Sequence, residues 1–130
     1  MTPRVHDGAA MIAGMSPVLT EGRFVFATGA DPALLSHAVA TCREDEGLSL
    51  ILPEDIARAA EMVCSAPMRR ITLEVHSSLE GVGLTAAVAT ALAEAGIACN
   101  MVAGNHHDHA FVPADRAEEA LQVLKDLSAG

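Results

Sequence analysis

Hydrophobic and polar positions alternate most regularly just beyond the middle of the chain. Apolar side chains at Ile71, Leu73 and Val75 alternate with polar ones, which is the period-two pattern of a strand with one buried face. Gly81 and Gly83 interrupt this pattern, and an amphipathic helix follows. The sequence therefore predicts a strand, a glycine-bearing turn and a helix in succession.

The apolar residues of this helix lie on one side. Leu84, Val88 and Leu92 recur every four residues, and alanines between them widen the stripe. Gly96 closes the helix as a C-terminal cap, and a second strand runs to Ala103.

Both halves of the chain contain a strand, a proline and a helix in that order. Residues 48–52 precede Pro53, and residues 107–112 precede Pro113. The two prolines lie 60 positions apart, and several residues after one proline match those after the other at the same separation. The pattern therefore indicates an internal repeat. The apolar face predicted for the first of these helices consists of Ile56, Ala59, Ala60 and Val63.

The first half also contains a predicted strand at residues 23–28 and a hairpin that begins with a strand at residues 37–43 and turns at acidic residues. No clear helix separates the first strand from the hairpin. Either a short N-terminal helix, with Met11 and Met15 on its apolar side, packs there out of sequence order, or residues 33–38 supply a single turn.

The order of elements indicates the fold class. From Ile71 onward, the order strand, helix, strand, strand, helix becomes the βαββαβ order of a ferredoxin-like unit once one strand is added. The prediction is an α+β protein with two such units in tandem, at residues 1–66 and 67–130, whose antiparallel sheets are backed by helices.

Composition and charge exclude several classes of function. The 130 residues are 51% hydrophobic with three Phe and no Trp or Tyr, so no aromatic platform for nucleic-acid bases is present. The formal net charge of −9 repels phosphate backbones and anionic lipid heads, so we expect neither nucleic-acid nor membrane binding. Three separated cysteines without a CxxC pair, and an N-terminal apolar run too short for a signal peptide, indicate a protein of the reducing cytoplasm.

The glycine-bearing turn is the first candidate for chemistry. A turn at a helix N-terminus exposes backbone N–H groups that suit a carboxylate or a phosphate, although the glycines can equally serve only to let the chain turn. Residues 81–86 also fit the dinucleotide fingerprint GxGxxA. This match is weak, because residues 77–80 separate it from the strand and no acidic residue ends the second strand.

A second polar cluster, Asn105 to His109, precedes the last strand. Strand alternation places His107 and His109 on one face and His106 and Asp108 on the other, so at most two of them can reach one metal ion. We therefore expect a hairpin turn with polar contacts and no metal site. Because no residues form a nucleophile with its base or an acid–base set, we also expect neither an enzyme nor a cofactor.

The second half of the chain resembles a known family. A resemblance to the ACT domain, a small ferredoxin-like module that senses amino acids, is carried by HSSLEGVGLTAAVATALAEAGIACNMVAG and its continuation HDHAFVPADRAEEALQVL. The first half is similar to the leading unit of uncharacterised bacterial proteins made of two ACT units, through FVFAT, EDEG and LSLILPEDIA. The second unit of those proteins resembles the ACT repeats of aspartate kinases, so two ACT-type units are expected.

The resemblance implies a regulatory protein that holds an amino acid between ACT units, with the units assembled into a homodimer or a higher homo-oligomer. It also implies that the loop after the first strand and the start of its helix receive the ligand carboxylate, while the second strand holds the amine and side chain. Carried over to this chain, the implied ligand-binding residues are Leu79, Gly81, Val82, Gly83, Leu84, Asn100, Met101 and Val102.

A different class of function is also compatible with the sequence. The chain lacks the kinase catalytic domain that an aspartate kinase ACT pair regulates, so its output requires mass action, assembly or a protein partner. The alternative to an amino-acid sensor is a structural or protein-interaction module, which keeps the fold without a ligand and dimerises through exposed sheet edges.

Overall fold

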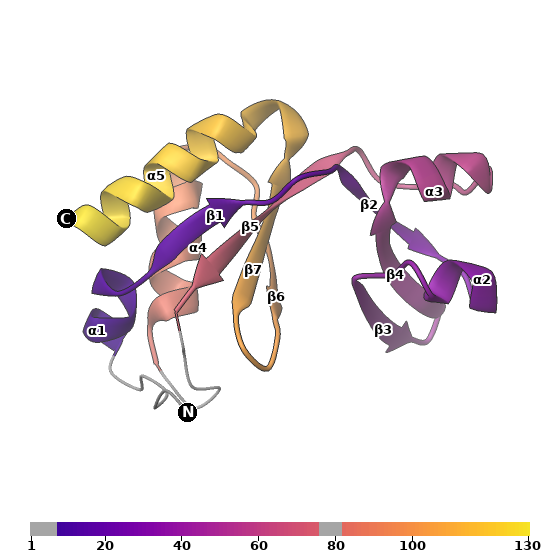
Figure 1. The fold of residues 1–130 in the computed structure, drawn as a ribbon, viewed down its shortest axis with the longest axis horizontal. Coiled ribbons are helices and arrows are strands. Elements are labelled where there is room, and N and C mark those ends of the chain that lie inside the picture. Colours follow the sequence, from indigo (N-terminus) through magenta and orange to yellow (C-terminus); the bar gives the residue numbers. More distant parts are fainter. Residues whose placement is uncertain (1–7, 76–81) are drawn as a thin grey trace.

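A computed structural model describes residues 8–75 and 82–130 of the chain (Figure 1). The helices are α1 (Gly8–Ala13), α2 (Pro32–Leu35), α3 (Glu54–Ala59), α4 (Leu84–Glu94) and α5 (Ala117–Ala129), with a 3-10 turn, η1 (Ala114–Arg116), before the last. The strands are β1 (Ser16–Leu19), β2 (Phe24–Thr28), β3 (Ala40–Glu44), β4 (Gly47–Pro53), β5 (Met68–Glu74), β6 (Asn100–Ala103) and β7 (Asp108–Pro113).

The strands form one antiparallel sheet with two ferredoxin-like halves. The order is β3-β4-β2-β5-β7-β6, and β1 also pairs with β5. β2 and β5 share only the pair Phe24–Met68, and from there the two halves diverge. Helices α4 and α5 back one half, and the shorter α2 and α3 back the other (Figure 1). The predicted α+β class with two such units is thus confirmed, whereas the doubly wound parallel sheet of a dinucleotide-binding fold is not what this chain forms.

The second half takes its fourth strand from the N-terminal part of the chain. β1 pairs with residues 71–74 of β5, so the order across this half is β1-β5-β7-β6. α5 ends beside the start of β1, where the Ser128 hydroxyl donates to the Met15 carbonyl at 2.6 Å. Followed from β5 through α5 and on to β1, this half is a complete βαββαβ unit whose last strand comes first in the sequence.

The N-terminal helix packs on the second half. Met11 and Met15 are buried there in one cluster with Leu84 and Leu124, which face them from α4 and α5. The proposal that this helix fills the missing position of the first half is therefore wrong. The division of the sequence at residue 66 stays a prediction, but in space α1 and β1 lie with the second half.

The first half has a helix between its first strand and its hairpin, α2. It is a single turn, as predicted by the alternative that placed one at residues 33–38. Pro32 starts it, and the Asp31 carboxylate caps it by accepting a hydrogen bond from the Ala33 N–H at 2.9 Å. Residues 36–38 continue this turn, and the Val39 N–H then donates to the Ile51 carbonyl of β4 at 2.8 Å, so the strand expected from residue 37 begins only at Ala40.

The helix after Pro53 is shorter than its sequence pattern indicates. α3 ends at Ala59, because Glu61 adopts a left-handed conformation with φ 55° and the chain turns back toward the sheet. The buried residue of α3 is Ala57. The predicted apolar stripe is wrong, since Val63 lies beyond the helix and is 95% exposed.

The internal repeat recurs in three dimensions. Pro53 and Pro113 each end a central strand and precede a helix. In each half, the N–H of the residue after the proline donates to the backbone carbonyl of the residue just before the half's first strand. Glu54 donates to the Arg23 carbonyl at 2.9 Å, and Ala114 donates to the Pro67 carbonyl at 3.0 Å. The two prolines therefore occupy equivalent corners, and positions in β2 can be compared with positions in β5.

The regular pattern around Ile71 and Leu84 forms as predicted. The inward residues of β5 and α4 are all buried, as is Val75 directly after β5: Ile71, Leu73, Val75, Leu84, Val88 and Leu92. Gly96 follows the last turn of α4, and its φ of 73° is the left-handed conformation that ends a helix. The Arg116 guanidinium donates to the carbonyls of Gly96 and Ala95 at 2.8 and 3.1 Å and so satisfies the end of the helix.

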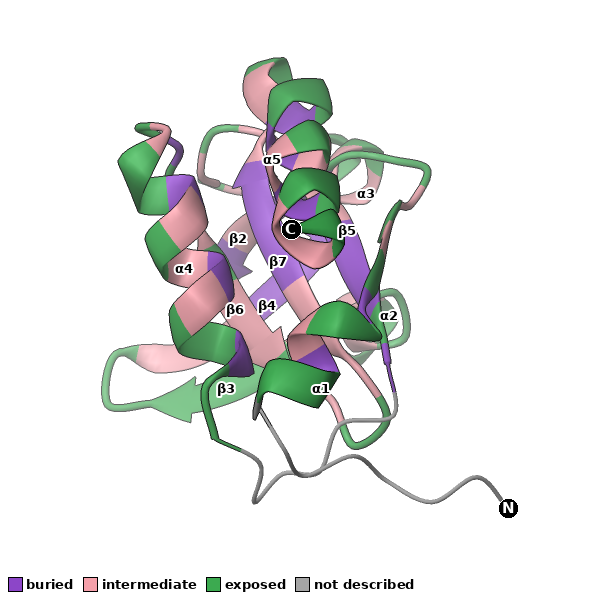
Figure 2. Ribbon diagram, turned by 90° about the vertical axis from the view of Figure 1, so that its left-hand side faces the viewer, coloured by how far each residue is buried: buried purple, intermediate pink, exposed green. Residues whose placement is uncertain are grey.

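Buried side chains form a core in each half and a small junction between them. Figure 2 shows the buried residues along the central strands and on the inner sides of α4 and α5. The junction lies where the uncovered faces of the two half-sheets meet, and all three phenylalanines of the chain gather there. Phe111 meets Phe24 and Phe26 edge to face, with ring centroids 5.8 and 6.0 Å apart.

Candidate functional site

α4 begins at a glycine in a conformation that other residues rarely adopt. Gly83 has φ 109° and ψ −21°, in the left-handed region. Leu84 is buried and anchors the first turn, whereas Val82 is 80% exposed beside it. The first intrahelical bond runs from the Ala87 N–H to the Gly83 carbonyl at 2.9 Å, so the N–H groups of residues 84–86 lie free of intrahelical partners.

Among the described residues, the start of α4 carries no carboxylate of its own. No side chain caps the helix, and its first turn contains no acidic residue. The first turns of α3 and α5, by contrast, contain the pairs Glu54 with Asp55 and Glu118 with Glu119. In a chain with a net charge of −9, the partial positive charge of the α4 dipole therefore remains available to a ligand carboxylate.

The predicted residues of the second strand lie on β6, at the edge of the sheet. Met101 packs against the core under the helices, while Asn100 and Val102 face the uncovered side. Asn100 is exposed, and its amide nitrogen lies 3.9 Å from the Met68 sulfur. Val102 packs against the phenylalanine junction.

One copy of the chain does not bring the start of α4 and Asn100 together. Asn100 lies opposite Phe111, which lies opposite Arg70 near the beginning of β5, whereas the chain leaves for α4 from the other end of β5. α4 also covers the other face of the sheet (Figure 1). The structure thus groups Val82 with Gly83 and Leu84, and Asn100 with Val102; Leu79 and Gly81 lie outside the described residues.

The histidine cluster forms the expected hairpin turn between β6 and β7. The Gly104 N–H donates to the His107 carbonyl at 2.9 Å. Nδ1 of His109 lies 3.0 Å from the Thr72 hydroxyl, and Nδ1 of His107 lies 3.3 Å from the Val75 carbonyl. Within the described part of the chain, no three His, Cys, Asp or Glu side chains come together to hold a metal ion.

His109 is expected to make the stability of the protein depend on pH. Burial lowers the pKa of His109 below its ordinary value of 6.5, and the charge of Arg70 lowers it further. Because its pKa is lower in the folded state, the unfolded chain binds more protons at His109. The stability associated with neutral His109 is therefore complete above about pH 6.5 and is lost as the pH falls toward the lower folded-state pKa. Urea unfolding midpoints should therefore decline from about pH 7 to pH 5. The decline should be smaller in His109→Gln, whose amide can still reach Thr72; equal pH profiles for both proteins would contradict this role.

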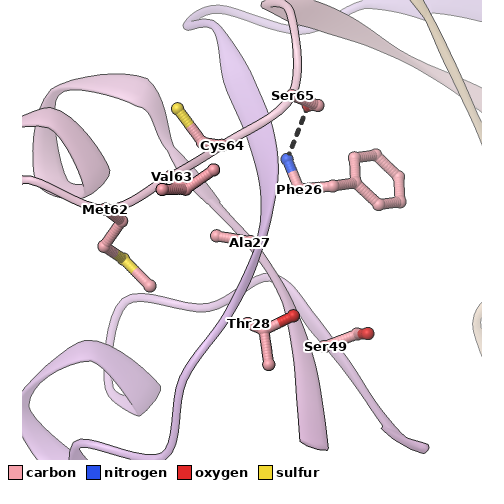
Figure 3. A pocket seen from close by; sticks show the side chains of 8 residues that line it. All are labelled: Phe26, Ala27, Thr28, Ser49, Met62, Val63, Cys64 and Ser65. Atoms are coloured by element: carbon pink, nitrogen blue, oxygen red, sulfur yellow. Dashed lines mark hydrogen bonds between the residues drawn. The ribbon is translucent and has the colours of Figure 1, made fainter. Parts of the chain in front are cut away.

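An open pocket lies at the outer edge of β2 in the first half (Figure 3). Its volume is about 560 Å³, and it is lined by Phe26, Ala27, Thr28, Ser49, Met62, Val63, Cys64 and Ser65. The Phe26 N–H donates to the Ser65 hydroxyl, and the Ser65 N–H donates to the Phe26 carbonyl, both at 2.9 Å. Pairing along this edge ends with the bridge between Ala27 and Cys64, so Thr28 has no strand beside it on the outer side.

Comparison with known families identifies both halves. Residues 3–69 and residues 65–126 match two family profiles, each described as an ACT domain. No curated protein matches the chain. In the described residues, none of the helices combines the length and the apolar character that crossing a membrane requires.

Solved structures share this fold over nearly the whole chain. A protein of unknown function from Vibrio cholerae, a possible transport protein, is 47% identical, with 92% of this chain and 94% of that chain covered and a TM-score of 0.83. A protein from Agrobacterium tumefaciens is 19% identical, with coverages of 98% and 91% and a TM-score of 0.75. The ligand-free regulatory subunit of aspartate kinase from Thermus thermophilus is 11% identical, with coverages of 88% and 97% and a TM-score of 0.64.

Proposed function

The chain belongs to the ACT domain family, and on that premise we propose that it is a non-catalytic sensor that binds an amino acid where ACT units meet. ACT domains are typically regulatory ligand-binding modules, and the regulatory subunit of an aspartate kinase shares the fold. The three cysteines are free, which is compatible with a reducing cytoplasm.

The observation that carries the proposal is the start of α4. It combines a left-handed glycine, unpaired N–H groups and the absence of any acidic residue in the first turn. A free amino acid presents a carboxylate that such a helix start can bind. Gly83 and Leu84 supply the backbone there, and Val82 borders it.

The position of Asn100 favours an assembly of copies. Asn100 lies on an edge strand and on the face opposite α4, so the start of α4 that completes its site would come from a second copy of the chain. In this arrangement Asn100 and Val102 of one copy hold the amine and the side chain, and α4 of the other copy holds the carboxylate. The proposal therefore includes a homodimer or a higher homo-oligomer.

A thermal-shift screen with the twenty amino acids tests the proposal. One amino acid should raise the melting temperature, and the rise should grow with the logarithm of its concentration, since a ligand at a hundred times its Kd stabilises a protein by about 2.7 kcal/mol. Gly83→Val should abolish the response, because valine is strained at φ 109° and shields the N–H groups.

Gly22→Val provides the matched control. Gly22 also has a positive φ, 91°, and no atom lies within 4 Å of the position that a Cβ would occupy, so the substitution strains the backbone away from the site. It should lower the melting temperature and leave the ligand response intact. A wild-type protein that responds to none of the twenty amino acids would refute the sensor.

A second candidate function is protein interaction, and the open edge of β2 favours it. In the second half, β1 covers the outer edge of β5, while in the described part of the first half the pairing along the outer edge of β2 stops at the bridge between Ala27 and Cys64. An extended segment of a partner could pair with β2 beyond that bridge. Protection of the Thr28 amide from hydrogen exchange upon addition of a partner, together with no response to amino acids, would select this function over the sensor.

A further inference from the structure

A cavity that is partly open to solvent lies between the uncovered faces of the two half-sheets, away from the start of α4. Its volume is about 150 Å³, and its lining residues are Phe26, Ala40, Thr41, Cys42, Ser49, Ile51 and Val102. They come from β2, β3 and β4 of the first half and from β6 of the second.

The size and lining of this cavity suit a small apolar group. The side chains of Phe26, Ala40, Ile51 and Val102 give it a mainly hydrocarbon wall. An engineered protein cavity of roughly 150 Å³ with a wall of Leu, Ile and Phe stays dry and binds benzene. A group of about four to six carbon atoms therefore fits here by size and by polarity.

Polar groups stand beside the apolar wall. The Ser49 hydroxyl donates to the carboxylate of Glu44, which lies on the same face of β3 as Ala40. On the opposite side, Asn100 lies two residues before Val102 and therefore on the same face of β6. The lining of the cavity thus includes one hydroxyl, Ser49, that is bonded to a carboxylate, while Asn100 lies on the same face of β6 just beyond the lining residue Val102.

We propose that this cavity receives the side chain of the bound amino acid, and that the ligand is an aliphatic amino acid of the size of valine, leucine, isoleucine or methionine. The inference rests on the proposed function and specifies its ligand class. As in the proposed function, Val102 contacts the ligand side chain, the ligand ammonium lies toward Asn100, and the ligand carboxylate stays outside the cavity, where α4 of a second copy can reach it. Because both half-sheets line the cavity, the ligand fixes their relative position.

Ala40→Leu tests the proposal by filling the cavity from the edge strand. Isothermal titration with L-valine, L-leucine, L-isoleucine and L-methionine should show binding to the wild-type protein, with glycine and L-aspartate weaker. In Ala40→Leu the affinity for the best ligand should fall about tenfold or more, as expected when methylene groups compete for one pocket. Arg43→Leu adds an exposed leucine to the opposite face of the same strand and should bind like the wild type.

The outcomes separate this inference from the proposed function. If no amino acid binds the wild type, both fail. If an amino acid binds but Ala40→Leu has the wild-type affinity, or if glycine or aspartate binds best, only this inference is overturned. Should Ala40→Leu not fold, Val102→Ala enlarges the same cavity, and the preference should move toward bulkier side chains such as phenylalanine; an unchanged preference would also overturn the inference.

Discussion

A chain that begins at Arg23 is expected to lose the folded structure of its second half. The deletion removes β1, the fourth strand of that half, and with it Met11 and Met15, which are 1% and 3% exposed. Full burial of two such side chains contributes about 3–6 kcal/mol, which approaches the entire stability of a small domain at about 5–15 kcal/mol. Circular dichroism and NMR spectra of the truncated protein should show the loss of native signals from α4, α5, β6 and β7.

A circular permutant is the matched control for this deletion. Residues 8–22 can be attached after Gly130 through a flexible linker, because α1 contacts α5 and Ser128 donates to the Met15 carbonyl. This permutant has the continuous βαββαβ order of a ferredoxin-like unit and should regain the native spectrum. Native chemical shifts in the truncated protein without the added segment would show that β1 is dispensable.

The regular part of the second half could be predicted because its signals are local. Strict alternation in β5 and the four-residue spacing of Leu84, Val88 and Leu92 each specify one element and one buried face. Gly96 and Pro113 mark element ends through backbone conformation alone, which a sequence displays directly. In this region the predicted and observed elements agree.

The partner of the N-terminal strand could not be predicted in the same way. β1 is four residues long, contains Pro17, and pairs with a strand more than fifty positions away. Nothing within residues 16–19 distinguishes β5 from the other strands as the partner. The shortness of α3 has a similar cause, since Glu61 adopts a left-handed conformation that its residue type does not favour.

Of the two parts of the candidate site, one could likewise be predicted from local sequence and the other could not. The start of α4 could be predicted, because Gly83 and the apolar stripe that follows it are adjacent in the sequence. The cavity between the half-sheets could not, because Phe26, Ala40 and Val102 reach it from strands of different halves. Only Val102 was among the ligand-binding residues that the resemblance implied, and the sequence signal for the others is the ordinary apolar pattern of strands.

Phe111→Ala is expected to lower the free energy of unfolding by about 3–5 kcal/mol and to uncouple the two halves. Phe111 is 1% exposed and meets both Phe24 and Phe26 edge to face. Apart from this cluster, the strands that join the halves share only the pair Phe24–Met68 among the described residues. Removal of the ring therefore takes away both edge-to-face contacts at the centre of the junction, in addition to leaving a cavity.

Hydrogen exchange separates this uncoupling from a simple loss of stability. Val112→Ala is the matched control, since Val112 is the next residue of β7, is fully buried, and faces the core under α4 and α5. Val112→Ala should raise amide exchange in the second half alone, whereas Phe111→Ala should also raise it in β2 and β4. Unchanged protection of β2 and β4 in Phe111→Ala would show that the halves fold independently. Phe26 belongs both to this junction and to the wall of the cavity, which Val102 of the second half also lines, so a ligand bound there contacts both halves and should strengthen the coupling that Phe111→Ala weakens.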